Sequence, residues 1–179
     1  MQRAVIRIFD GALERVLEPG ETLFRTGDMV GHMVIVRTGV VLLERVTRRG
    51  GRIVLQQAHA GTVVSEASAY GVQYHCDAVA TGEGARVALL PLGEFHHRLE
   101  RDAESMRAWA AGLAQTVQAA RLRAELRSLR TVSDRLDAWL GAQRGLPPRG
   151  AWQGLAAELG VSREALYREL ARRREAEKS

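Results

Sequence analysis

The amino-acid composition and hydrophobic pattern of the sequence change near Phe95, and this change limits the folds that the chain can adopt. Before it, from Val5 to about Leu99, short runs rich in Val, Ile and Leu alternate with glycine-containing turns, which predicts β-structure. After it, residues 102–130 contain no Pro and a single Gly, Gly112, among Ala, Leu, Gln, Glu and Arg, which predicts one long helix. We therefore expect an α+β chain.

The first part, residues 1–101, predicts an antiparallel β-barrel of the jelly-roll type. The run "HMVIVRTGVVLLERV" holds two apolar stretches joined through Thr38–Gly39, which we interpret as a hairpin. "RIVLQQA" and "ARVALLPL" are further candidate strands. Many short strands at close spacing favour a barrel or jelly roll, because closure leaves few exposed strand edges. We expect this domain to be the sensor.

The long helix, residues 102–130, carries an apolar stripe that predicts dimerisation. Its members recur at steps of four and three residues, which is the spacing of a coiled-coil seam, and small residues let two helices approach closely. They are Met106, Ala110, Leu113, Val117, Ala120 and Ala124. An amphipathic helix packed on its own barrel gives the same steps, so this alternative stays open. The length of the helix favours a parallel homodimer.

The last part, residues 131–179, predicts a helix-turn-helix. A helix over "TVSDRLDAWLGAQ" and the linker "RGLPPRG" precede the segment "WQGLAAELGVSREALYREL". In that segment Gly160 suits the tight turn, and Val161 would fill the angle between the two helices. The expected inner face consists of Leu155, Ala156, Leu159, Leu166 and Leu170.

The residues left outside this core predict contact with double-stranded DNA. Ser162 is a natural N-cap for the second helix, and its hydroxyl and the helix N-terminus suit a phosphate. Glu164, Arg168 and Arg172 recur every four residues, and Arg163 projects from the first turn. Arginine can donate two hydrogen bonds to guanine, and glutamate can accept one from cytosine. The alternative is that Glu164 and Arg168 form a surface ion pair.

The charge distribution agrees with a polyanionic partner. The chain has a formal net charge of +5, and residues 121–179 carry 13 basic against 8 acidic side chains, so the whole excess lies there. An arginine-rich solvated surface is the alternative. The single cysteine, Cys76, excludes an internal disulfide and a four-thiolate iron–sulfur cluster from one chain. No apolar run of about 20 residues occurs, so we expect a cytoplasmic protein without a membrane partner.

The chain resembles the Crp/Fnr superfamily of bacterial transcription regulators from about Val16 to Arg173. The resemblance is carried by "LEPGETLFRTGD", "GTVVSEAS", "RVALLPLGEF", "RTVSDRLDAWL" and "LGVSREALYREL". It implies a cyclic-nucleotide-binding-type barrel, a dimerisation helix and a winged helix-turn-helix that reads two-fold DNA sites with TGA-like half-sites. It also implies that Ser162 holds phosphate, that Arg163, Glu164 and Arg168 read bases, and that RNA polymerase is a partner.

The departures from this family pattern concern the effector pocket and the wing. Glu66 is kept, but Ser65 stands where the family has Gly, and the phosphate-gripping Arg–Ser/Thr pair falls on His75–Cys76. Neither His nor Cys is a permanently charged bidentate donor, so we do not expect tight binding of cyclic AMP. We also expect a wing that is short or absent. The cofactor stays unknown: a metal or haem, an altered small ligand and no ligand at all are open.

Two rival classes of function were weighed against a DNA-binding regulator. One is a cupin-like metal-binding barrel enzyme, but the histidines of "EFHHRLE" are adjacent rather than one residue apart, and no motif of a hydrolase or metalloprotease occurs. We therefore expect no enzymatic activity. The other is a dimeric regulatory protein that binds a protein partner rather than DNA.

Overall fold

The computed structural model describes residues 2–47, 50–143 and 145–176. It divides the chain into two compact units, Met1–Leu113 and Ala114–Ser179. The boundary between them falls inside the long helix, whereas the sequence analysis placed boundaries after residues 101 and 130.

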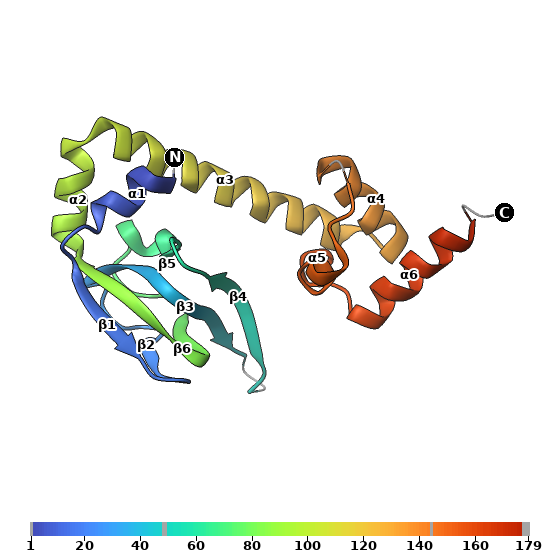
Figure 1. The fold of residues 1–179 in the computed structure, drawn as a ribbon, viewed down its shortest axis with the longest axis horizontal. Coiled ribbons are helices and arrows are strands. Elements are labelled where there is room, and N and C mark those ends of the chain that lie inside the picture. The colour runs from blue at the N-terminus through green and yellow to red at the C-terminus, as the bar shows by residue number, and fades with distance from the viewer. Residues whose placement is uncertain (1, 48–49, 144, 177–179) are drawn as a thin grey trace. The chain divides into compact units, whose positions relative to one another are not determined.

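The first unit is an antiparallel six-stranded sheet with helices packed at one end (Figure 1). The strand order is β1–β6–β3–β4, with β2 also paired to β6 and β5 also paired to β3. Its elements are α1 (Gln2–Ile8), β1 (Leu13–Leu17), β2 (Thr22–Phe24), β3 (His32–Val46), β4 (Arg52–Ala58), β5 (Val63–Val64), the 3-10 helix η1 (Glu66–Tyr70), β6 (Asp77–Pro91) and α2 (Leu92–Arg101). The predicted β-rich domain is confirmed.

The predicted hairpin at Thr38–Gly39 is wrong, because β3 runs through these residues as one strand of 15 residues. It pairs with the equally long β6, and the register shifts on both sides of Gly39. Gly39 has φ +78°, and a Cβ there would lie 2.3 Å from the carbonyl oxygen of Gly84. A β-bulge and a turn both require a glycine of positive φ, so the residue marks a bend here rather than a reversal.

Two apolar clusters fill the first unit. One lies inside the barrel and includes Phe24, Val36, Tyr74 and Cys76. The other joins the end of the sheet to the helices and consists of Ile8, Phe9, Met33, Ile35, Val63, Ala69, Ala88, Leu90, Phe95, Leu99 and Trp109.

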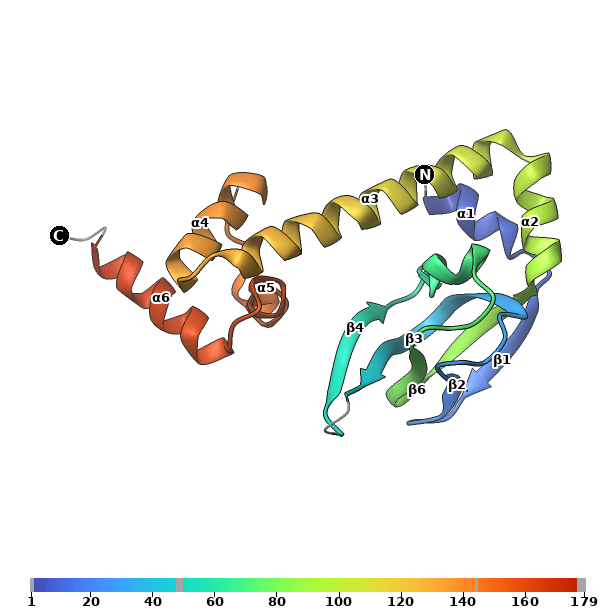
Figure 2. The ribbon, with the colours of Figure 1, turned by 180° about the vertical axis from the view of Figure 1, so that it is seen from behind.

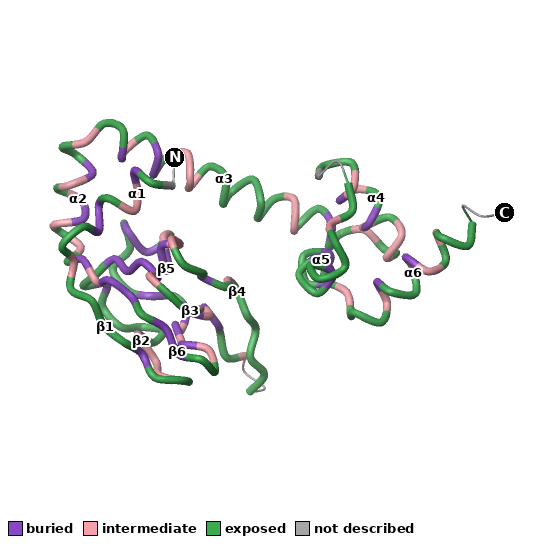
Figure 3. The backbone as a smooth tube through the Cα atoms, in the orientation of Figure 1, coloured by how far each residue is buried: buried purple, intermediate pink, exposed green. Residues whose placement is uncertain are grey.

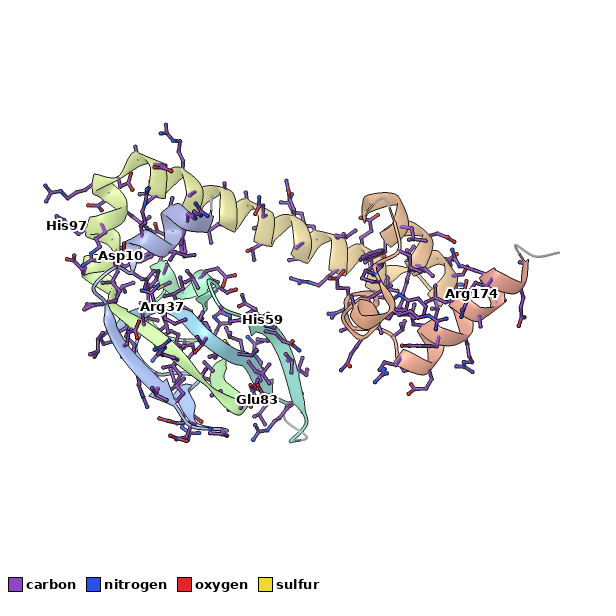
Figure 4. All side chains as sticks on the ribbon, in the orientation of Figure 1. Asp10, Arg37, His59, Glu83, His97 and Arg174 are labelled. Carbon is purple, nitrogen blue, oxygen red and sulfur yellow. The ribbon has the colours of Figure 1, made fainter. Side chains whose placement is uncertain are left out.

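Arginine side chains close the corner between α1, α2 and the sheet. Arg98 donates to the carbonyl oxygens of Ile8 and Asp10 at 2.8 and 2.7 Å, and Arg37 donates to that of Phe9 at 2.9 Å. Asp10 and Arg37 are labelled in Figure 4. Carbonyl groups at the end of a helix have no partner within it, so these arginines supply the missing donors for α1.

The predicted long helix is confirmed as α3 (Ala103–Ser128). It begins after Asp102, whose carboxylate accepts the backbone N–H of Glu104 at 3.0 Å and the hydroxyl of Ser105 at 2.6 Å. The indole of Trp109 packs into the second apolar cluster, which joins the sheet to the helices, and its edge contacts the Phe95 ring. Among the residues predicted for a dimer seam, Met106 and Leu113 also pack partly on that cluster.

The rest of the predicted seam is exposed. Ala110, Val117, Ala120 and Ala124 are open to solvent, and every residue from 114 to 121 is exposed (Figure 3). The two interpretations of the stripe, packing on the chain's own sheet and a dimer seam, therefore apply to different parts of the helix. The N-terminal part covers its own sheet, and the part after Leu113 leaves an apolar stripe without a cover among the described residues.

The second unit is a small helical domain, also visible in Figure 2. After the end of α3 it contains α4 (Val132–Gln143), the 3-10 helix η2 (Arg149–Ala151), α5 (Trp152–Leu159) and α6 (Arg163–Ala176). Leu126, Leu136 and Trp139 supply the core from α3 and α4. Over the described residues of both units, no helix is long and apolar enough to cross a membrane.

Candidate DNA-binding interface

The turn between α5 and α6 has the geometry predicted for a helix-turn-helix. Gly160 adopts the left-handed conformation with φ 65° and ψ 39°, and the N–H of Val161 donates to the carbonyl oxygen of Ala156 at 3.0 Å. The expected inner face is buried in one cluster: Leu155, Ala156, Leu159, Leu166 and Leu170. Val161 packs against this cluster, as the sequence predicted.

Arg135 of α4 fixes this turn, although sequence reasoning did not single it out. Its guanidinium donates to the carbonyl oxygens of Leu159 and Gly160, both at 3.1 Å, and to that of Leu129 at 2.9 Å. One side chain thus ties together the end of α3, the start of α4 and the turn. No periodicity signals such a residue, because its partners are backbone groups 24 and 25 positions away in the chain.

Ser162 caps α6 as predicted, because its hydroxyl oxygen accepts the backbone N–H of Ala165 at 3.2 Å. The Glu164 carboxylate turns back to the same helix end. It accepts its own backbone N–H and the Ser162 hydroxyl, and these contacts lower the pKa of Glu164.

Arg163 and Arg168 are the two cationic residues predicted to read bases, and both are exposed on α6. The guanidinium carbon of Arg163 lies 6.0 Å from the centroid of the Tyr167 ring. Within the described residues, the guanidinium of Arg168 makes no hydrogen bond or ion pair. The first two turns of α6 therefore expose two arginines: Arg168, which has no hydrogen bond or ion pair among the described residues, and Arg163, which lies next to the Tyr167 ring.

Arg172, the third residue of the predicted stripe, is turned into an internal network. It donates to the Glu169 carboxylate at 2.7 and 3.0 Å and to the Ser133 hydroxyl at 3.4 Å. Each four-residue step advances about 40° around a helix, so Arg172 lies about 80° from Glu164 and reaches the flank of α4. The structure thus separates Arg172 from the outward pair Glu164 and Arg168.

Arg173 and Glu169 complete this network. Arg173 pairs with Asp137 at 2.6 Å and with Glu169 at 2.7 Å, and it donates to the carbonyl oxygen of Ser133 at 3.1 Å. Hydrogen bonds from Arg172, Arg173 and Ser133 lower the pKa of Glu169 to about 2. Arg174, labelled in Figure 4, donates to the carbonyl oxygen of Leu170 at 3.1 Å. Much of the C-terminal arginine charge therefore stabilises the domain itself.

The predicted effector pocket is divided between the inside and the outside of the barrel. Cys76 is fully buried, His75 is exposed, and Glu66 is half-buried at the start of η1. His75 and Cys76 lie in a bend just before β6, and only the second of them is covered by the core. Burial raises the pKa of the Cys76 thiol, and its hydrogen bond to Ser65 opposes this in part. A buried neutral thiol is a poor metal ligand and a poor nucleophile.

Ser65 and Ser68 connect η1 to Cys76. Ser65 has φ 58°, and it is the only non-glycine residue of positive φ among the described residues. Its hydroxyl lies 2.9 Å from that of Ser68, and both side chains are buried. A buried hydrogen-bonded group thus takes the place of the family's Gly.

An aromatic pair fills part of the core of the first unit. Phe24 and Tyr74 stack in it with ring centroids 3.7 Å apart, and the Tyr74 hydroxyl donates to the carbonyl oxygen of His32 at 2.7 Å. A cation lies next to this core: Arg45 donates to the carbonyl oxygen of His75 at 3.0 Å, and its charge opposes the rise in the pKa of Cys76.

Comparisons with known proteins agree with this architecture. Residues 14–102 match the cyclic nucleotide-binding domain family. The catabolite activator protein of Thermus thermophilus is 24% identical with a TM-score of 0.57, and the match covers 97% of this chain and 84% of that one. FixK2 of Bradyrhizobium japonicum is 20% identical with a TM-score of 0.63, covering 90% and 83%.

A third similar structure covers mainly the barrel. The sensor domain of the transcriptional regulator DNR from Pseudomonas aeruginosa is 18% identical with a TM-score of 0.54, covering 70% of this chain and 81% of that one. No curated protein matches the sequence.

The chain thus combines a β-sheet domain, a long helix and a helix-turn-helix in this order. Residues 14–102 match the cyclic nucleotide-binding domain family, and the fold of the chain is similar to those of the catabolite activator protein and FixK2.

Proposed function

We propose that this chain is a sequence-specific DNA-binding transcription regulator that acts as a homodimer. The observation that carries the proposal is the exposed N-terminal half of α6, where Arg163 and Arg168 stand clear of the core on a turn held by Arg135. Arginines at the start of a recognition helix are placed to donate to guanine O6 and N7 in the major groove. Double-stranded DNA with TGA-like half-sites is the proposed ligand, and RNA polymerase is the proposed protein partner.

Glu164 and Ser162 act together in this proposal. Glu164 accepts a hydrogen bond from a cytosine amino group, and the Ser162 hydroxyl donates to a phosphate oxygen. Arg172 contributes less than its place in the sequence suggests, because Glu169 neutralises it.

The exposed stripe of α3 supports the homodimer. Val117, Ala120 and Ala124 are apolar and uncovered over a stretch in which every residue from 114 to 121 is exposed. A second copy of the helix would cover them in a coiled-coil seam. Two recognition helices held in this way would enter successive major grooves of the DNA, about 34 Å apart.

Cyclic AMP is not the proposed effector. His75 and Cys76 stand at the positions where the family pattern has its phosphate-gripping pair, and neither is a permanently charged bidentate donor, which supports a sensor domain that does not bind a cyclic phosphate tightly. Calorimetric titration of the protein with cyclic AMP tests this point, and micromolar or tighter binding would contradict it.

The central test is binding to duplexes that carry a TGA inverted repeat, compared with scrambled duplexes, by fluorescence anisotropy. Arg168→Ala should lose about 1–3 kcal/mol of discrimination per half-site. Arg107→Ala, which removes an exposed arginine from the other unit, is the matched control. Equal binding of both duplexes by the wild type, or unchanged discrimination in Arg168→Ala, would contradict base reading.

A further inference from the structure

Two arginines and two aromatic rings form a continuous row on the surface of the second unit. The guanidinium carbon of Arg149 lies 5.5 Å from the centroid of the Trp152 ring. The Trp152 and Tyr167 rings meet edge to face, with centroids 5.2 Å apart and planes 71° apart. The guanidinium carbon of Arg163 then lies 6.0 Å from the Tyr167 centroid. These four residues, from η2, α5 and α6, are called the arginine–aromatic row below.

The centre of this row is rigid and its ends are open. Trp152 is 5% exposed, and its indole N–H donates to the carbonyl oxygen of Pro147 at 2.9 Å, so the ring is fixed in place. Tyr167 is 39% exposed, and both arginines are exposed. The buried Trp152 ring thus packs against the exposed Tyr167 ring, and each ring lies next to the guanidinium of one arginine. Cations over aromatic faces are held in position without losing their charge.

Neither arginine of the row is neutralised. Within the described residues, no ion pair or hydrogen bond of the Arg149 or Arg163 guanidinium is formed with an acidic side chain. This contrasts with Arg172 and Arg173, which Glu169 and Asp137 hold on the other flank of α6. The arginines on one flank of α6 are thus held in ion pairs, whereas the flank beside α5 and η2 carries two arginines without an ion pair, with the Glu164 carboxylate close enough for the charge of Arg163 to lower its pKa.

We propose that the arginine–aromatic row extends the DNA interface beyond α6, and this inference rests on the DNA-binding function proposed above. Arg149 binds a backbone phosphate outside the bases read by α6, and Tyr167 is a positioning residue that holds Arg163 over its ring. Three contacts connect the guanidinium groups of Arg149 and Arg163: Arg149 to the Trp152 ring at 5.5 Å, Trp152 to Tyr167 at 5.2 Å and Tyr167 to Arg163 at 6.0 Å. Together they set an upper limit on the separation of the two guanidinium groups. This is the scale of the major groove, about 12 Å wide, so Arg163 can face base edges while Arg149 faces a strand that borders the groove.

The two roles predict different losses. A phosphate contact is independent of sequence and releases counterions, so Arg149→Ala should weaken specific and scrambled duplexes by the same factor. It should also lower the slope of log affinity against log salt by about 0.9 per protomer. Arg149→Lys should keep that slope, because the charge remains. Tyr167→Leu should reduce discrimination between the duplexes about two- to five-fold per protomer, as expected for losing an exposed cation–π contact, whereas Tyr167→Phe should keep it.

The experiment is fluorescence anisotropy of the full chain on a TGA inverted-repeat duplex and a scrambled duplex between 50 and 300 mM KCl, concentrations chosen on the order of physiological salt. Arg107→Ala is the control for loss of one positive charge, and circular dichroism verifies that each variant is folded. The inference is overturned if Arg149→Ala keeps the wild-type salt slope, if it weakens only the specific duplex, or if Tyr167→Phe loses as much discrimination as Tyr167→Leu. If the wild type binds neither duplex, the proposed function and this inference fail together. If the wild type binds and Arg168→Ala loses discrimination while Arg149→Ala keeps its slope, only the inference fails.

Discussion

The guanidinium of Arg135 donates to the carbonyl oxygen of Gly160 at 3.1 Å, so the turn that precedes α6 is held by a side chain from α4. The same guanidinium reaches the carbonyl oxygen of Leu159 at 3.1 Å. Gly160 closes α5 in the left-handed conformation, and its carbonyl and that of Leu159 have no helical partner. Arg135 therefore holds the turn itself, while the apolar core and the ion pairs of Arg173 join α6 to α4.

Replacing Arg135 should loosen this turn. Arg135→Met keeps much of the aliphatic length but removes hydrogen bonds to four backbone carbonyls, those of Arg127, Leu129, Leu159 and Gly160, and hydrogen bonds to charged groups contribute about 1.5–3 kcal/mol. We expect the free energy of unfolding of the second unit to fall by about that amount, followed by tryptophan fluorescence in urea. Arg130→Met, an exposed neighbour in the same unit, is the control. Equal stability of the two variants would show that water replaces the guanidinium without loss.

The network around Glu169 should make the second unit sensitive to acid. The pKa of Glu169 is lowered from 4.5 to about 2 by Arg172, Arg173 and Ser133, so the fold favours the ionised carboxylate. The resulting stability is fully present above pH 4.5 and is lost as the pH falls toward 2. We expect about 1–2 kcal/mol, less than the pKa shift alone implies, because Arg172 is open to solvent and screened.

Urea unfolding of the wild type and Glu169→Gln at pH 7 and at acidic pH measures this effect. The variant should be less stable than the wild type at pH 7, and the difference should shrink as the pH is lowered. Glu125→Gln, on the exposed face of α3, should show neither change. A difference that is constant with pH would mean that Glu169 acts through packing rather than through its charge.

Ser65 combines backbone strain with a buried hydrogen bond, and two substitutions separate them. Ser65→Ala keeps the strained φ of 58° and loses the bonds to Ser68 and Cys76, so it should destabilise the barrel by about 1–2 kcal/mol. Ser65→Gly loses the same bonds but relieves strain of about 1–2 kcal/mol, so its stability should lie near that of the wild type. Thermal unfolding by circular dichroism gives the order. If Ser65→Gly is as unstable as Ser65→Ala, the backbone at this position is not strained.

The elements that the sequence predicts well are those fixed by local composition. The long helix follows from the near absence of Gly and Pro, and the observed bounds differ from the expected ones by one or two residues at each end. The helix-turn-helix follows from Gly160 and the apolar spacing around it. In both cases each residue's role is decided by neighbours within about two helical turns.

The features that sequence reasoning missed depend on distant contacts. Gly39 bends a strand rather than turning the chain, because Gly84 lies against it, and the sequence alone does not bring these residues together. Arg172 has the spacing of a base-reading residue, but Glu169 and Ser133 bind it. Arg135 and the arginine–aromatic row are likewise defined by partners in other helices.

The exposed stripe of α3 gives the most direct test of assembly. Val117 is 48% exposed and lies among residues that are all open to solvent, so a charge there should be harmless in a single chain. In a coiled-coil seam the same charge would be buried without a partner, at about 3–5 kcal/mol, which corresponds to at least a hundred-fold weaker dimer. Val117→Glu should therefore shift the mass measured by light scattering from two chains to one.

Gln118→Glu adds the same charge at the next position, about 100° around the helix, and should leave the mass unchanged. If Val117→Glu stays dimeric, or if the wild type is a single chain at micromolar concentration, α3 is not the seam. The two recognition helices would then need another element to hold them about 34 Å apart, because one helix-turn-helix reads only a half-site. Loss of the dimer in Val117→Glu should in turn abolish the preference for inverted repeats over isolated half-sites, even though α6 itself is unchanged.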